Sequence, residues 1–410
     1  MKRILSLTLI AGLGPAMVLA QEAEPGGVFF TFDLGQGLTA NSDRDLATTD
    51  EESGIGSVTT LDFGAVTETR TQRLSFDLGT ALRVTDGEFS DDGLSVGLAY
   101  SRNSADAQLD ASVSQRRADI AFLRDASAFV TDDGEIVLPD DFDELTGTGV
   151  RAVTAANVSL TWGDTAPVGY RVSASYTGLR YEDASAPPAD IDTAGVSIGL
   201  RLDINAVTTS EITLGYAQTD EEGLPVTDST TLGGALTFAR PLGDLTARVG
   251  ASRDEMGDLF WSAAIERELV LSDRELSGAL GVVQDAEGDA QLTGRIALRV
   301  PRPSGQIDFA AIHSLSAGAS TATTTLRASY VQELSAISSM RIGFDFASVG
   351  ETDSSDTLAT GRLSASYGIS LGEEWQLNIG VSTTIRDDDG SQTRNNAVFL
   401  TVERPFTWRL

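Results

Sequence analysis

Arginines recur on the polar face of segments in which apolar and polar residues alternate. A guanidinium is permanently charged and carries several hydrogen-bond donors, so a set of them around a water-filled passage favours anions. Neighbouring acids could instead pair with these arginines and only keep the passage wet, and both interpretations stay open. The arginines are Arg73, Arg83, Arg116, Arg171, Arg201, Arg248, Arg295, Arg299, Arg327, Arg341 and Arg362.

A second charged group lies in residues 118–150, the one long stretch between two alternating segments. Suppose that the alternating segments are strands that close into a barrel around the passage, and that this stretch folds into it. Its acids would then face the arginines on the barrel wall. The stretch would narrow the passage, and the opposed charges would give a field that selects solutes by charge. The alternative is a mobile surface loop. The acids are Asp132, Asp133, Glu135, Asp140, Asp141, Asp143 and Glu144.

No catalytic centre, metal site or cofactor is predicted. The only histidine, His313, stands in no recognisable hydrolase motif, and there is no cysteine. The acidic run 387–390 lacks the spaced oxygen ligands that a calcium loop requires, so a solvated loop is the expectation.

The element that must position these charges is best seen in residues 73–84. Apolar side chains occupy nearly every even position, and charged or small side chains occupy the odd ones. This period of two predicts a strand with one apolar and one polar face. A strand of about ten such residues suits a wall with lipid on one side and water on the other.

The first residues of the chain indicate export, and the remainder indicates a single domain. Residues 1–20 combine a basic start, an apolar core and a small-residue cleavage site, so they are predicted to be a signal peptide. A short lead at 21–27 precedes a single predicted barrel at 28–410. The formal charge of −31 excludes nucleic acid as a partner.

The connections between alternating segments fall into two sets. Short, weakly charged turns, such as 163–165 and 241–243, alternate with longer acidic loops, such as 181–192 and 219–228. In up-and-down bacterial barrels the short turns are periplasmic and the long loops external. The count gives about twenty strands, with eighteen the next expectation and sixteen the lower bound, and 118–150 becomes the third external loop.

The apolar positions form rows that are predicted to face lipid. Examples are Val196, Ile198 and Leu200 in one segment, and Ile342 and Phe344 in another. Most aromatic residues gather near the ends of the segments, as in the interfacial girdles of membrane barrels.

These features resemble Gram-negative outer-membrane β-barrels of the porin type. A final segment, 395–410, with apolar residues at alternate positions belongs to that resemblance, although it ends in Leu410 and contains Pro405. The resemblance implies an all-β antiparallel barrel in the outer membrane. It also implies contact with membrane lipid and lipopolysaccharide, the barrel-assembly machinery during biogenesis, and small hydrophilic solutes as cargo; a homo-oligomer is compatible with it.

Three functional hypotheses follow from this architecture. The first is a porin-like passive channel without enzymatic activity, favouring anions through its arginines. The second is a non-transporting barrel or scaffold, or one linked to export of surface polysaccharide. The third, a secreted soluble β-solenoid, is disfavoured because the loop lengths are irregular. Small inward residues, such as Gly79 and Ser95, favour the channel.

Overall fold

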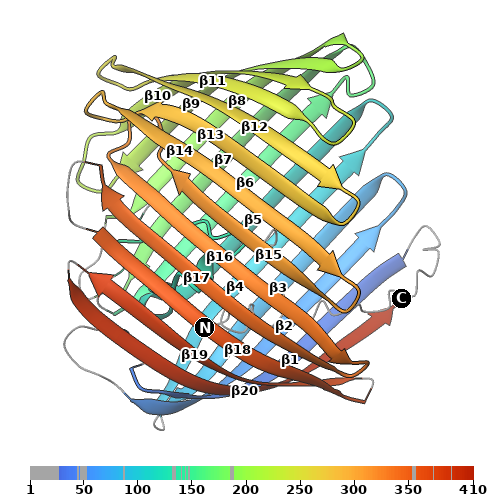
Figure 1. Ribbon diagram of the computed structural model, residues 1–410, viewed down its shortest axis with the longest axis vertical. Coiled ribbons are helices and arrows are strands. Elements are labelled where there is room, and N and C mark those ends of the chain that lie inside the picture. Colours follow the sequence, from blue (N-terminus) through green and yellow to red (C-terminus); the bar gives the residue numbers. More distant parts are fainter. Residues whose placement is uncertain are drawn as a thin grey trace.

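The fold is a closed antiparallel β-barrel (Figure 1). The computed structural model describes residues 27–43, 46, 53–85, 88–131, 135–139, 141–143, 145, 148–184, 189–352, 357–372, 374–388 and 390–410. The predicted signal peptide and nearly all of the predicted lead lie outside these residues. No helix in the described ranges is long and apolar enough to cross a membrane.

Twenty strands make up the barrel in the described residues, as the spacing of the turns predicts. They are β1 (Gly27–Asn41), β2 (Gly54–Glu68), β3 (Gln72–Thr85), β4 (Glu88–Asn103), β5 (Ala107–Asp119), β6 (Val150–Trp162), β7 (Val168–Glu182), β8 (Ile191–Asn205), β9 (Thr208–Glu221), β10 (Thr227–Phe238), β11 (Leu245–Arg253), β12 (Leu259–Leu271), β13 (Arg274–Gln284), β14 (Ala290–Arg302), β15 (Gly305–Ser314), β16 (Thr321–Ser335), β17 (Ser338–Glu351), β18 (Thr357–Leu371), β19 (Trp375–Asp388) and β20 (Ser391–Arg409).

Each strand pairs with its neighbours in the chain, and β1 also pairs with β20, which closes the ring. Proline has no amide hydrogen for the ladder, yet Pro405 lies opposite Asp33 within this closing pair. β20 therefore continues past the proline to Arg409.

The two faces of the wall follow from side-chain parity. On β17, Ile342 and Phe344 are 41% and 38% exposed, whereas Ala347 and Val349 are 0% and 5% exposed. Residues that lie opposite each other in a ladder share a face, and Phe63 lies opposite both Phe32 and Leu78. An apolar row therefore crosses β1, β2 and β3 on the outside, as the alternation predicts.

The turns and loops lie at opposite ends of the barrel. The chain begins β1 and ends β20 at the end that carries the short turns, such as 206–207 and 272–273. At the other end, residues 120–149 form one long connection between β5 and β6, which we call the insertion. Within it the structure describes a short helix, α2 (Ile120–Leu123), and a 3-10 helix, η1 (Ala126–Phe129).

Candidate functional site: the lumen and its insertion

The described part of the insertion packs against the inner face of the wall. Its short helices begin at Asp119 and Asp125, whose carboxylates accept hydrogen bonds from the amides of Ala121 and Ser127 at 2.9 and 3.0 Å. Such side-chain caps satisfy amides that a helix start leaves unpaired. The caps let the chain turn sharply as it leaves β5.

Apolar side chains of the insertion form a core with the far part of the wall. Ile120, Leu123 and Phe142 belong to one buried cluster with Ala347 of β17 and Leu358 of β18. These wall residues are far from β5 and β6 around the ring. A segment can contact them only from the lumen, and Figure 1 shows α2 and η1 within the outline of the barrel.

Charged wall residues hold the same segment. The guanidinium Nη1 of Arg362 on β18 donates to Asp125 Oδ2 at 2.7 Å and to Ser127 Oγ at 2.9 Å. Arg386 on β19 donates to the carbonyl oxygen of Arg124 at 3.5 Å. These bonds attach the start of the insertion to β18 and β19.

Two more contacts reach other strands. The guanidinium carbon of Arg83 on β3 lies 3.9 Å from the ring centroid of Phe122, a cation–π geometry. Further along the insertion, Glu135 forms an ion pair with Arg295 on β14. Since β3 and β14 lie on different sides of the ring, the insertion spans the lumen between them.

The last part of the insertion, before β6, is bonded to β6 and to the neighbouring strand β7. Arg151 on β6 donates two hydrogen bonds of 2.6 Å to the carboxylate of Asp141, which also accepts one from the hydroxyl of Tyr181 on β7. Asp141 is therefore a structural partner of the wall. It is not an acid facing open solvent.

The predicted acids of the insertion thus have different surroundings. Glu135 contacts the wall across the lumen, Asp141 contacts it at the root, and Asp143 is exposed. The remaining four predicted acids, Asp132, Asp133, Asp140 and Glu144, lie outside the described residues.

Several predicted lining arginines are paired with acids of neighbouring strands. Nitrogen–oxygen distances are 3.4 Å for Arg248 and Glu266, 3.2 Å for Arg299 and Asp308, and 3.3 Å for Arg327 and Asp345. Arg341 lies on the same inward parity of β17 as Asp345.

The guanidinium of Arg201 binds backbone carbonyl groups of a turn. Its Nη2 donates to the carbonyl oxygens of Gly163, Asp164 and Ala166 at 2.9, 3.1 and 2.9 Å. It therefore fastens the turn between β6 and β7.

Three predicted lining arginines have no acidic partner in the part of the chain that the structure describes. Arg73 is exposed near the turn end of β3, and Arg116 points into a cavity beside the insertion. Arg171 donates a hydrogen bond of 3.4 Å to the hydroxyl of Thr161. These three are therefore the predicted lining arginines whose charge no described acid balances.

The inner face of the wall also carries acids that are not part of these pairs or of the insertion. Parity, cross-strand neighbours and cavity contacts put six further carboxylates on the inner face, namely Asp33, Asp62, Glu211, Glu268, Glu275 and Glu403. Together with the cross-strand ion pairs, these acids balance much of the arginine charge in the described lining.

The sequence analysis also missed residues that attach the insertion. Asp125, Phe122 and Arg386 were not identified, although Arg386 follows the parity of Thr384 on β19 and that signal could have found it. Within the described ranges no group of three or more histidine, cysteine or acidic side chains is arranged to hold a metal ion.

Comparison with known proteins supports the fold. No family model and no curated protein sequence matches the chain. Among solved structures, the siderophore receptor PirA from Acinetobacter baumannii is 7% identical with a TM-score of 0.52, and PirA from Pseudomonas aeruginosa is 12% identical with a TM-score of 0.50. Each match covers 92% of this chain and 80% of the receptor.

A looser likeness is to the outer membrane protein opdK from Pseudomonas aeruginosa. It has a TM-score of 0.41 and 11% identity, and covers 93% of this chain and 99% of that one. At these identities the comparisons show the fold alone, and the chain has the fold of an outer-membrane β-barrel.

Proposed function

We propose that the protein is a porin-like passive channel for small hydrophilic solutes across the outer membrane of a Gram-negative bacterium. The observation that carries the proposal is a closed ring of twenty strands crossed by an insertion that is fixed to the wall. A barrel of sixteen or more strands encloses an aqueous lumen unless something fills it. The insertion narrows that lumen and so limits the size of the solute.

The lining is consistent with passage of water and polar solutes. Inward positions include small residues such as Gly79, Gly97 and Ser112 beside the charged side chains. A scaffold without transport would gain stability from large side chains at these positions.

We propose a weak preference for anions, carried by the arginines that lack an acidic partner among the described residues. Arg73, Arg116 and Arg171 lie on β3, β5 and β7. Inward acids such as Asp33 and Glu403 carry negative charge that counteracts these arginines, so the preference for anions should be small.

Planar-bilayer recordings of the purified protein test this proposal. In a salt gradient we expect stepwise conductance with a reversal potential displaced modestly toward that of the anion. Replacing Arg116 and Arg171 together by glutamine should move the reversal potential toward the cation, because two uncompensated positive charges are lost. A correctly folded protein that produces no conductance steps would contradict the channel and favour the scaffold or export-linked hypothesis.

A further inference from the structure

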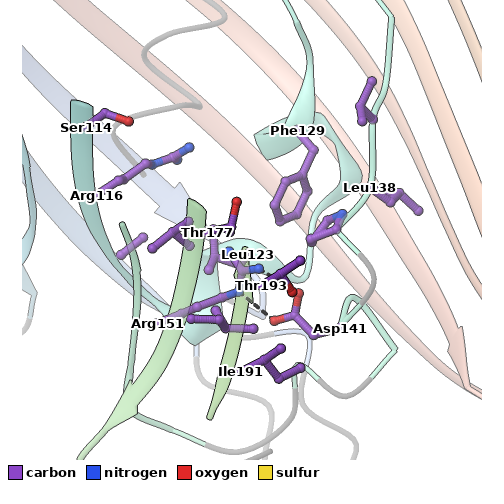
Figure 2. Close-up of a pocket in the computed structure, with 15 residues that line it drawn as sticks. Ser114, Arg116, Leu123, Phe129, Leu138, Asp141, Arg151, Thr177, Ile191 and Thr193 are labelled. Carbon is purple, nitrogen blue, oxygen red and sulfur yellow. Dashed lines mark hydrogen bonds and ion pairs between the residues drawn. The ribbon is translucent and has the colours of Figure 1, made fainter. Parts of the chain in front are cut away.

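A side cavity of about 510 Å³ lies between the insertion and the wall formed by β5 to β8 (Figure 2). Ligand sites for small molecules typically have volumes of about 300–1,000 Å³. The cavity has a polar part on the wall and an apolar part that is shared by the wall and the insertion.

The polar lining of the cavity includes Arg116 of β5. Figure 2 shows Arg116 and Ser114 projecting from the same strand, with the hydroxyls of Thr177 and Thr193 also among the lining groups. Arg116 makes no hydrogen bond or ion pair with another described residue. An uncompensated guanidinium is a suitable partner for a carboxylate.

The second guanidinium of the cavity is already neutralised. Arg151 binds both oxygens of Asp141, at 2.6 Å each, and Asp141 is 5% exposed. The described lining therefore offers one uncompensated positive charge, which suits a monoanion better than a dianion such as phosphate.

The apolar part can hold a hydrocarbon chain. Leu123, Phe129 and Leu138 come from the insertion, and Leu179 and Ile191 come from the wall. Most of these side chains are aliphatic and flexible, and none presents a hydrogen-bonding group. Such a surface favours an apolar ligand body and disfavours a sugar or a polar amino acid.

We propose that the side cavity binds an aliphatic monocarboxylate, with its carboxylate on Arg116 and its chain against Phe129 and Leu138. The inference deepens the proposed channel function and rests on it for the route by which the ligand arrives. Binding itself requires only the folded protein.

The probe is sodium hexanoate, titrated against the whole protein in lipid nanodiscs and followed by saturation-transfer difference NMR, with empty nanodiscs as the blank. We expect saturable binding, and butanoate should bind about sixteenfold more weakly, because it lacks two methylenes and each buried methylene contributes about a fourfold factor. Hexanamide and hexylammonium should bind at least tenfold more weakly than hexanoate.

Two variants locate the site. Arg116→Gln should weaken hexanoate binding at least tenfold. Arg180→Gln, which removes a guanidinium paired with Asp192 on the face of β7 opposite to the cavity residues Thr177 and Leu179, should leave it unchanged. Leu138→Asp, in the insertion, should also weaken binding and tests the apolar part if Arg116→Gln fails to fold.

The inference is overturned if folded Arg116→Gln and Leu138→Asp proteins bind hexanoate like the parent, or if hexylammonium binds as tightly. Its failure is separable from that of the channel. A parent protein that conducts in bilayers without binding hexanoate contradicts the inference alone, and one that binds hexanoate without conducting contradicts the channel alone.

Discussion

Arg362 and Asp125 form an ion pair whose side chains are 5% and 13% exposed. Removing one partner of a buried pair leaves the other charge unsolvated, which costs about 3–5 kcal/mol. We therefore expect Arg362→Gln to loosen the start of the insertion and to lower the free energy of unfolding. Limited proteolysis within the insertion should become faster, and thermal melting of the purified protein should occur at a lower temperature.

The control for this change is Arg248→Gln. Arg248 and Glu266 are 57% and 37% exposed, and pairs in such positions contribute about 0–1 kcal/mol. Equal effects of the two substitutions would show that the Arg362 contact does not anchor the insertion.

For a single charged side chain, the sequence predicts the face of the strand but not the partner. Alternation predicts the face on which Arg327 lies, but its partner follows from the register that sets it opposite Asp345. Asp125 and Arg362 are 237 residues apart in the chain. No local pattern relates such residues, so the partners of the arginines were not predictable.

We propose that the insertion is the element that decides the width of the lumen. Deleting residues 131–144 removes Glu135 and Asp141, and with them the contacts to Arg295 and Arg151, while leaving α2 and η1 on the far wall. A wider passage offers less resistance to ions, so we expect a higher single-channel conductance in planar bilayers.

The matched control is a deletion in another connection at the same end of the barrel, residues 255–257 between β11 and β12. This connection is short and closes on itself, with Asp258 donating its amide to Asp254 at 2.8 Å. Its loss should leave the conductance as it is. An unchanged conductance after removal of 131–144 would exclude the insertion as the constriction.

Strands were predictable where one face is apolar and the other polar or small, and less so where this contrast is weak. In β1, Gln36 occupies an outward position between Leu34 and Leu38, and glycines occupy inward ones, so the contrast between faces is weak. The acidic run 387–390 was expected to be a solvated loop, yet β19 continues to Asp388. Aspartates are common in turns, and here they continue a ladder with β20.

The whole molecule depends on an outer surface that is apolar around the ring. Ile198 on β8 is 55% exposed on that surface. An arginine near the middle of the lipid-facing band costs about 2–4 kcal/mol. We expect Ile198→Arg to reduce the yield of folded protein in lipid vesicles, whereas Met256→Arg, in a connection outside the band, should have little effect. The heat-modifiable shift on gels measures the folded fraction, and equal yields would contradict a lipid-facing Ile198.

Closure of the ring by β1 and β20 can be tested directly because the chain has no cysteine. Leu38 lies opposite Leu400, and directly opposed residues in antiparallel strands have Cα atoms about 4.5–5.5 Å apart, within the range for a disulfide. Leu38→Cys with Leu400→Cys should therefore oxidise to an internal disulfide in the folded protein. Ile379 lies opposite Leu400 on its other side, so Leu38 and Ile379 are two strand spacings, about 9.6 Å, apart. Leu38→Cys with Ile379→Cys should stay reduced, and an open sheet would abolish this difference.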